Sequence, residues 1–337
     1  MVYNEIVEKL GELEQLTAVG FPDGSVDTYV QMMKGKSGRI TDRHEVAKKI
    51  EENSSASFRV TPERREPGGK SFNMSLQCDS LGLETAHYGY LNNSIFNHTG
   101  FQTYSMGTPA DVTIAEFENG SLLLSEETPE LTEWKLEDLK KFNKLEEVLS
   151  ADVICCANWT SIHHMTSELE KIAEEKIEAE VFSFDPGNLT DIESDRIKEM
   201  FTALEKISER SEVQVHANSD EVKRTAEIYG IEGETSQKIN QVQETTGIDA
   251  YILHDKYRAV AGTEEGVVEV ENLVTDHVET RTGAGDRFDA GVSAGRAAGW
   301  SWEESLALGN LCAVQYVENN KTATPETIRK QVEEKVN

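Results

Sequence analysis

The feature of this sequence that most limits its fold is a regular alternation of apolar segments with segments of helical spacing. The apolar, strand-like segments are 16–21, 85–90, 151–158, 181–185, 213–218 and 251–254. Helical spacing predicts helices over 70–81, 136–149, 288–298, 303–317 and 325–336. Strands that alternate with helices in this way favour a parallel sheet covered on both faces, so the sequence predicts an α/β fold.

Two regions interrupt this alternation. Residues 24–66 carry two alternating, strand-like segments on either side of a charged helix-like stretch at 41–52. Residues 100–128 carry two more strand-like segments around Asn119-Gly120, a dipeptide typical of hairpin turns. We expect both regions to form a small antiparallel lid, with the core made of 1–23, 67–99 and 129–337.

The charge of the chain is strongly acidic and is spread along its length. The 337 residues include 62 Asp and Glu but only 33 Lys and Arg, a formal charge of −29. Such repulsion destabilises a compact chain at a screening length of about 8 Å and largely disappears at about 3 Å, in molar salt. We therefore predict a halophilic, cytoplasmic protein that binds no nucleic acid.

Composition excludes two further classes of protein. No run of 18 apolar residues exists, so we expect no membrane-spanning helix and no association with a membrane. The four cysteines are scattered and show no zinc-ligand spacing, which is typical of reduced cytoplasmic thiols.

The segment 280–291, TRTGAGDRFDAG, is the most informative for chemistry. Its glycines permit a tight turn, and a helical pattern follows directly. The free N–H groups at the start of a helix favour an anion. An anion hole followed by a carboxylate, Asp286, suits phosphoryl transfer to a hydroxyl, because the carboxylate can accept the proton of the attacking alcohol.

On these residues the chain resembles the ribokinase-like (PfkB) carbohydrate kinases, and its salt-adapted composition suggests a haloarchaeal member. The resemblance implies a doubly wound, mostly parallel sheet with a small β-lid. It also implies transfer of the γ-phosphoryl group of ATP, with Mg²⁺, to a sugar hydroxyl. Asp286 would be the base, and the amides of Gly283, Ala284, Gly285 and Asp286 would form the anion hole.

A second motif, PGGKSFN at 67–73, opens the helix predicted over 70–81. It is similar to the GG-x-x-x-N signature of the same family. The resemblance implies that Gly68, Gly69 and Asn73 line the sugar site, with Lys70 nearby. The alternative is an ordinary Pro-Gly turn before a helix.

A third motif, GSVD, follows the first strand. It resembles the early Asp of the family, which implies that Asp27 accepts hydrogen bonds from two sugar hydroxyls. A carboxylate suits a vicinal diol. The alternatives are a turn residue at Asp27, or Asp23 as the sugar ligand.

The remaining matches concern the nucleotide. The segment NSDE at 218–221 matches an N-x-x-E motif, which implies that Asn218 and Glu221 order the nucleotide phosphates and Mg²⁺, with Glu221 acting through water. A helix N-cap is the alternative for Asn218, and both can hold together. Asn310 stands where the family lines the adenine pocket; a helix-surface Asn is the alternative.

The chain departs from the family pattern in several places. His254-Asp255-Lys256 stands where a T-x-G turn is usual, and Thr280 replaces the usual Asp before the signature. Arg281 also departs from the signature. We interpret His254 and the pair His163-His164 as structural.

The lid region is positive although the chain is acidic. Residues 34–70 hold six acidic residues and ten basic ones, which are Lys34, Lys36, Arg39, Arg43, Lys48, Lys49, Arg59, Arg64, Arg65 and Lys70. We expect a phosphorylated acceptor such as ribose 1-phosphate or a hexose phosphate, held by Arg59 and Arg64. The alternatives are a homodimer interface through the lid, or no special role.

Other functions remain open on the sequence. Within the same fold the chain could be a nucleoside kinase or a 2-keto-3-deoxygluconate kinase. In another class, it could be a catalytically inactive, sugar-binding regulator. A dinucleotide-dependent oxidoreductase is disfavoured, because no GxGxxG follows the first strand.

Overall fold

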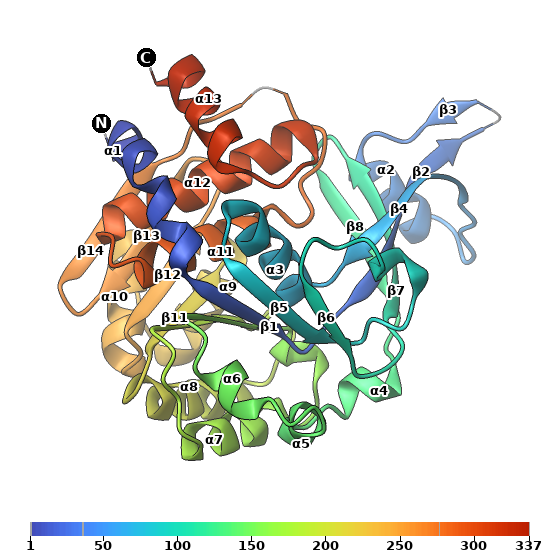
Figure 1. The fold of residues 1–337 in the computed structure, drawn as a ribbon. Helices are drawn as coiled ribbons and strands as arrows, with labels where there is room; N and C mark the ends of the chain where they lie inside the picture. Colours follow the sequence, from blue (N-terminus) through green and yellow to red (C-terminus); the bar gives the residue numbers. More distant parts are fainter. Residues whose placement is uncertain (1, 36, 276, 337) are drawn as a thin grey trace.

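The computed structural model describes residues 2–35, 37–275 and 277–336, and its centre is a large sheet (Figure 1). In these residues the sheet has nine strands, in the order β14-β13-β12-β11-β10-β9-β1-β5-β6. They are β1 (Thr17–Phe21), β5 (Glu84–Gly89), β6 (Gln102–Ser105), β9 (Val153–Ala157), β10 (Val181–Asp185), β11 (Glu212–Ala217), β12 (Ala250–His254), β13 (Arg258–Thr263) and β14 (Gly266–Glu271). The strands from β6 to β12 pair in parallel, while β13 and β14 form an antiparallel edge.

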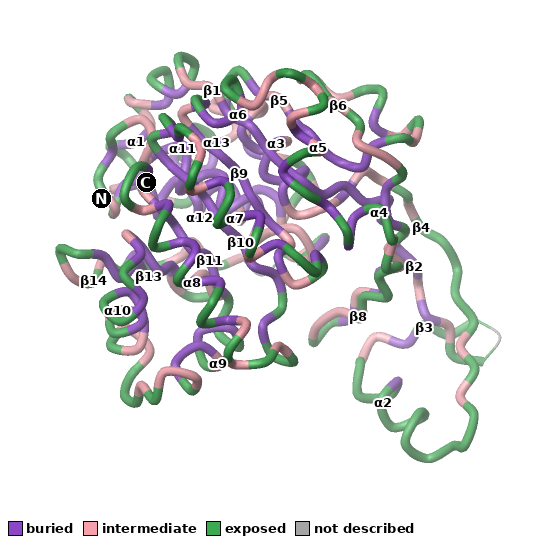
Figure 2. The backbone as a smooth tube through the Cα atoms, turned by 90° about the horizontal axis from the view of Figure 1, so that it is seen from below, coloured by how far each residue is buried: buried purple, intermediate pink, exposed green. Residues whose placement is uncertain are grey.

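Helices cover both faces of the large sheet, which confirms the doubly wound α/β prediction (Figure 1). One face carries α1 (Val2–Lys9), η1 (Leu10–Gln15), α3 (Lys70–Leu81), α11 (Ala284–Ala297), α12 (Trp302–Asn319) and α13 (Pro325–Lys335). The other carries α4 (Pro129–Thr132), α5 (Leu136–Lys140), α6 (Leu145–Leu149), α7 (Met165–Glu174), α8 (Ser194–Ser208), α9 (Ser219–Tyr229) and α10 (Thr235–Thr246). Short 3₁₀ turns lie at η2 (Ser94–Phe96) and η3 (Trp159–Ser161). The inner strands of the sheet are mostly buried between the two apolar layers, whereas the edge strands β6 and β14 are largely exposed (Figure 2).

Strand β1 is the point at which the connections of the sheet change direction. Its neighbours are β5 on one side and β9 on the other, and the chain continues outward from both. Ligands of open α/β sheets bind at the carboxyl ends of the strands beside such a point. Three polar residues lie at this edge: Asp23 after β1, Asp185 at the end of β10 and His254 at the end of β12.

A second, small sheet projects from this edge (Figure 1). Its strands are β2 (Ser25–Lys34), β3 (Gly38–Arg39), β4 (Arg59–Gly68), β7 (Ala110–Phe117) and β8 (Gly120–Ser125). Strand β2 pairs antiparallel with β4 but parallel with β7, so the sheet is mixed and not purely antiparallel as expected. Strand β6 lies within the expected lid segment 100–128, yet it pairs with β5 of the large sheet. The division of the chain into a core and a lid stays a prediction.

The helix-like insertion in the lid folds as α2 (Arg43–Glu51), which packs on the small sheet. The Asp42 side chain caps it by accepting the N–H of His44 at 2.8 Å. Val46 is buried with Val30, Met32 and other apolar residues of the sheet. The insertion therefore gives the lid an apolar core of its own.

The expected single helix over 136–149 is wrong. The structure has two short helices, α5 and α6, separated by a turn in which Asn143 adopts a left-handed φ of 56°. Apolar spacing continues through the turn, because Leu139, Val148 and Leu149 all face the same core. Periodicity alone therefore did not reveal the break.

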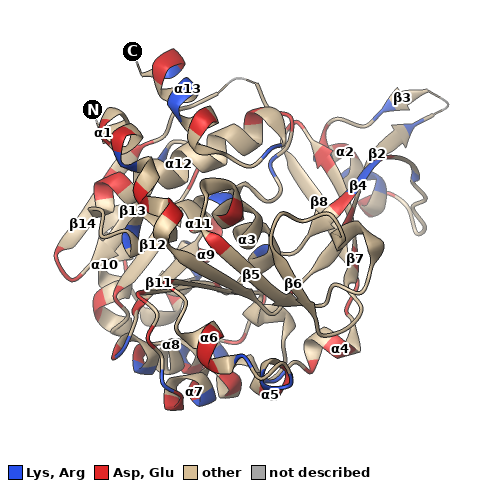
Figure 3. Ribbon diagram, in the orientation of Figure 1, with Lys and Arg blue, Asp and Glu red and all other residues tan. Residues whose placement is uncertain are grey.

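The helices of the described residues include none with both the length and the apolarity that crossing a bilayer requires. Acidic side chains are spread over the helices on both faces of the large sheet, while the Lys and Arg residues of the lid lie mainly on β4 and α2 (Figure 3). All four cysteines are buried as free thiols.

Candidate active site

The first turn of α11 forms the centre of the site. Gly283 is its N-cap, with a left-handed φ of 92° that glycine adopts without strain. The N–H groups of Gly285 and Asp286 find no acceptor among the residues that the structure describes, as expected at a helix start. One expectation needs correction: the Ala284 N–H already donates to the Arg281 carbonyl at 3.2 Å, so this amide is not free for an anion.

Asp286 is buried in this turn and contacts two side chains of α3. Asn73 Nδ2 donates to Asp286 Oδ2 at 2.7 Å, and Lys70 Nζ lies 3.8 Å from Oδ1. Burial raises the pKa of Asp286 to about 7; Lys70 opposes this shift and Asp185 adds to it. A carboxyl with a pKa close to neutrality is suited to accept a proton.

Lys70 lies between two carboxylates. Its ammonium is 2.6 Å from Asp185 Oδ2, in addition to its longer contact with Asp286. Burial alone would lower the pKa of Lys70, but the charges of Asp185 and Asp286 hold it well above its usual value. Burial likewise raises the pKa of Asp185, and the Lys70 ammonium outweighs this and brings it below the usual value. The site therefore contains a permanent cation.

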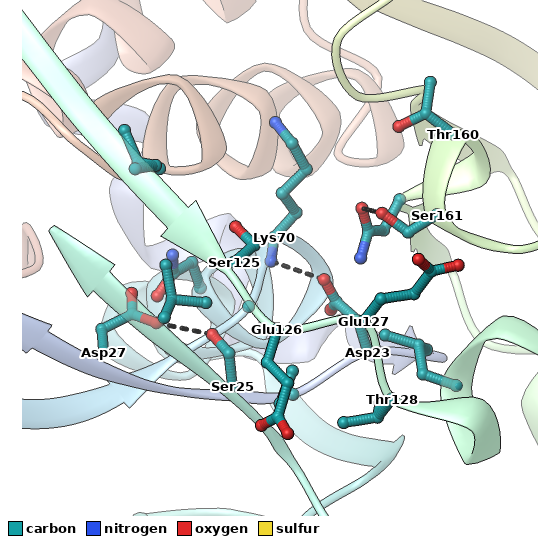
Figure 4. A pocket seen from close by; sticks show the side chains of 18 of the residues that line it. Asp23, Ser25, Asp27, Lys70, Ser125, Glu126, Glu127, Thr128, Thr160 and Ser161 are labelled. Carbon is teal, nitrogen blue, oxygen red and sulfur yellow. Dashed lines mark hydrogen bonds between the residues drawn. The ribbon is translucent and has the colours of Figure 1, made fainter. Parts of the chain in front are cut away.

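The two candidate sugar ligands after β1 have different roles in the structure. Asp23 accepts the N–H groups of Lys70 at 2.8 Å and Ser71 at 2.9 Å, so it caps α3. Asp27 lies on β2 with its carboxylate held by Ser25 Oγ at 2.6 Å (Figure 4). Burial raises the pKa of Asp27 to about 6. Its carboxylate lies against Gly68, where an added Cβ would come within 2.2 Å of Oδ2, so any larger residue at 68 would displace the Asp27 carboxylate.

Two cavities meet at the start of α11. The first, of about 500 Å³, is lined by Asp27, Gly69, Lys70, Asn73, Gly283 and Asp286 among others. The second, of about 390 Å³, is lined by Ala284, Gly285 and Asn310 and by apolar residues that include Leu273, Val274 and Val314. The turn 283–286 therefore separates a polar cavity from a more apolar one, and it contributes residues to both.

The pair Asn218 and Glu221 forms a capping box at the start of α9. The Asn218 side chain accepts the N–H of Glu221 at 3.1 Å, and Glu221 Oε2 accepts the N–H of Asn218 at 2.8 Å. The N-cap alternative therefore holds for Asn218. Burial raises the pKa of Glu221 to about 7, and the charge of Asp185 adds to the shift. A role of this pair toward a nucleotide stays a prediction.

Asn310 is buried on α12 and lines the apolar cavity, so it is not a helix-surface residue. Its Nδ2 donates to the Tyr3 hydroxyl at 3.2 Å. Its Oδ1 has no hydrogen-bond partner within the described parts of the chain, which leaves an acceptor available at this position.

The structure does not bring the lid arginines into the polar cavity. Arg59 is exposed on β4, opposite Met33 in the register and so away from Asp27. Arg64 stacks on Tyr29, 3.4 Å from the ring centroid, and bonds to Glu66 and Thr280. Lys36 lies outside the described residues. The expected phosphate clamp is therefore not supported by geometry, and a homodimer through the lid stays a prediction.

On the sequence we interpret His254 as structural, and the structure places it against the turn, beside Asp289, a buried residue that the motifs did not single out. His254 lines the apolar cavity, lies against Gly285, and places Nε2 3.8 Å from Asp289 Oδ1. Asp289 is fully buried, 3.0 Å from His216 Nδ1. Burial lowers the pKa of His254. His254 lies at the carboxyl end of a predicted strand, where ligands of open α/β sheets bind, and this position could have indicated from the sequence that it lies near the active site.

The fold is ribokinase-like, and comparisons with known proteins identify the chain as a carbohydrate kinase. The family model of prokaryotic ketohexokinase matches residues 23–335, so the chain belongs to that family. A ketohexokinase of Haloferax volcanii is 24% identical over 323 residues, covering 90% of this chain and 84% of its own.

Solved structures show the same fold. An adenosine kinase from Sinorhizobium meliloti superposes with a TM-score of 0.68 and 18% identity, over 94% of this chain and 98% of its own. A ribokinase from Thermotoga maritima gives a TM-score of 0.64 and 17% identity, over 94% and 98%. The chain is thus a carbohydrate kinase by family and ribokinase-like by fold.

Proposed function

We propose that this kinase transfers the γ-phosphoryl group of ATP to a hydroxyl of a neutral ketohexose. The observation that carries the proposal is the position of the first turn of α11. Gly283 and Asp286 line the polar cavity, while Ala284 and Gly285 line the apolar cavity. A sugar in the first cavity and a nucleotide in the second would meet at the free N–H groups of this turn.

Asp286 is the proposed base. It is held by Asn73 on the wall of the sugar cavity, and its pKa of about 7 allows it to take the proton of the attacking hydroxyl. The N–H groups of Gly285 and Asp286, with the ammonium of Lys70, stabilise the negative charge of the phosphoryl group in transfer. Asp27 orients the sugar by accepting hydrogen bonds from its hydroxyls.

Mg²⁺ fits the oxygen donors at this edge of the sheet. Burial and Asp185 raise the pKa of Glu221, and a dication beside it would restore its charged form. Lys70 already occupies the space between Asp185 and Asp286, so we infer that Glu221 holds the ion through water. The ion, when bound, would neutralise charge on the nucleotide phosphates.

Charge in the polar cavity favours a neutral acceptor over a sugar phosphate. Its lining includes five carboxylates, those of Asp23, Asp27, Glu126, Glu127 and Asp286. Among the described residues of its lining, the one lysine, Lys70, is already paired with two carboxylates, and the one histidine, His163, lies beside Glu127 and Glu133. A phosphate group on the acceptor would be repelled, whereas sugar hydroxyls can donate to carboxylates. This argues against ribose 1-phosphate and for a polyol such as a ketohexose.

An acceptor panel tests the proposal. The purified protein is assayed with ATP and Mg²⁺ in high salt against fructose, fructose 6-phosphate, ribose 1-phosphate, nucleosides and 2-keto-3-deoxygluconate. We expect phosphorylated fructose by ³¹P NMR, with kcat/KM at least about 100-fold above that of any anionic acceptor, a difference typical of repulsion by buried charge. A preference for a phosphorylated acceptor, or binding without turnover, contradicts it.

A further inference from the structure

One carboxylate oxygen of the lid bonds to three consecutive residues of the turn that precedes the proposed phosphate site. Glu116 is half-buried on β7, and its Oε1 accepts three hydrogen bonds from consecutive residues. The donors are the Thr280 hydroxyl at 3.0 Å, the Arg281 N–H at 2.8 Å and the Thr282 N–H at 3.3 Å. These are the residues at which the sequence departs from, and then enters, the TGAGD signature.

Two further hydrogen bonds join the lid and the turn, one donated by the turn and one donated by the lid. Arg281 Nη1 donates to the carbonyl of Phe117, the residue that follows Glu116 on β7, at 3.1 Å. Arg64 of β4 reaches the Thr280 hydroxyl at 3.4 Å from its stacked position on Tyr29. Thr280 is itself 1% exposed, so its hydroxyl is closed off from solvent between lid and core. We call Glu116, Thr280, Arg281 and Thr282 the latch.

The latch lies between the parts that the reaction must bring together. Thr282 directly precedes Gly283, whose left-handed backbone starts α11. Strand β7 also supplies Val112 and Ile114 to the wall of the polar cavity, which is the proposed sugar site. Arg281 lines the apolar cavity, which is the proposed nucleotide site. A movement of β7 away from the core would therefore remove the acceptor that fixes the turn next to the phosphate site.

We propose that Glu116 is a positioning residue, which couples docking of the lid to the geometry of the phosphate site. The inference rests on the proposed function, because it assumes that the turn 283–286 receives the phosphoryl group. With the latch formed, the free amides of the turn are held in place and the sugar cavity is covered. Without it, the turn is free to move, and water can compete with the sugar for the phosphoryl group.

The geometry distinguishes a hydrogen-bonding role from a purely electrostatic one. All three donors converge on the same oxygen, Oε1, and a glutamine amide also offers one carbonyl oxygen. Glu116→Gln therefore keeps the acceptor and loses the charge, while Glu116→Ala loses both. If the negative charge itself were important, the two variants would behave alike.

The experiment compares Glu116→Ala and Glu116→Gln with Glu118→Ala, a matched control on an exposed residue two positions along the chain. The readouts are kcat, KM for the sugar, and ADP formed per sugar phosphate. We expect Glu116→Ala to lower kcat by about tenfold or more, as for loss of hydrogen bonds to a charged group, and to form ADP in excess of product. Glu116→Gln should stay close to the wild type, and Glu118→Ala should not differ from it.

Hydrogen exchange of the peptide around 280–287 supplies a readout that does not depend on turnover. The Arg281 and Thr282 amides should exchange faster in Glu116→Ala and remain protected in Glu116→Gln. The inference is overturned if Glu116→Ala keeps the wild-type exchange, kcat and one-to-one product ratio, or if Glu116→Gln behaves like Glu116→Ala. A wild type that phosphorylates no sugar would defeat the proposed function, while the exchange result would still decide whether the latch holds the turn.

Discussion

Asn73 and Asp286 are 213 residues apart in the chain, yet Asn73 Nδ2 donates to Asp286 Oδ2 at 2.7 Å. The bond joins the first turn of α3 to the first turn of α11. Both helices begin at a glycine, Gly69 and Gly283, and both start at the edge of the sheet where the polar cavity lies. Two motifs that are separate in sequence therefore form one site.

The first prediction concerns this bond. Asn73→Ala removes the donor that orients the Asp286 carboxylate, so the base should lose its alignment with the sugar hydroxyl. We expect kcat to fall by about 10- to 100-fold, the usual range for a lost charge-assisted hydrogen bond. Steady-state kinetics measures this, with Asn92→Ala as a control because Asn92 is exposed. An unchanged kcat would show that the bond has no role in transfer.

Much of this site was predictable from sequence, and the reasons are local. Helix α3 was predicted at 70–81 and is found at Lys70–Leu81, because apolar spacing and the preceding glycines both mark its start. The TGAGD turn was predictable because few sequences combine two glycines, a helix start and a carboxylate. Chain order and strand pattern then placed both motifs at the same edge of the sheet.

Other features depend on distance through space, which a pattern cannot give. A positive lid segment suggested a phosphate clamp, but the exposed Arg59 is not among the residues that line the polar cavity, and Arg64 reaches Thr280. Glu116 lies in a strand-like segment whose pattern carries no information about its partners, which are three residues 164 to 166 positions later. Asn143 breaks a helix whose apolar spacing is uninterrupted.

The second prediction is the pH dependence of the reaction. Burial raises the pKa of Asp286 to about 7, and the base must be deprotonated to accept a proton. The value of kcat/KM should therefore rise with pH through about 7 and reach a plateau above it. A pH–rate profile in saturating Mg-ATP tests this; activity that stays level from about pH 5.5 to 8 would be incompatible with Asp286 as a base of this pKa.

The third prediction concerns two charged neighbours that shift the pKa of Asp286, and with it the rising limb of the pH–rate profile, in opposite directions. The ammonium of Lys70 lowers the pKa of Asp286, whereas the carboxylate of Asp185 raises it. Lys70→Met should move the limb to higher pH, and Asp185→Asn should move it to lower pH, whatever either change does to the plateau. Shifts in the same direction for both variants would mean that the limb reports another group.

The fourth prediction concerns salt. With a formal charge of −29, the folded chain should be more stable at about 3 M KCl than at about 0.1 M, because salt screens the repulsion between carboxylates. Thermal unfolding followed by circular dichroism measures the difference in Tm. Sucrose at equal viscosity serves as a control for general solvent effects. Equal Tm values at the two salt concentrations would remove the halophilic interpretation.

The activity of the variant Asp286→Asn tests most directly whether Asp286 is the base. The asparagine keeps the shape of the side chain but cannot take the proton of the sugar hydroxyl. We expect kcat to fall by about 10²- to 10⁴-fold, while the affinity for ATP, measured by equilibrium binding, stays close to the wild type because Asp286 does not line the apolar cavity in which we propose that the nucleotide binds. Retention of near wild-type kcat in the well-folded variant would contradict the role of Asp286 and, with it, the proposed mechanism.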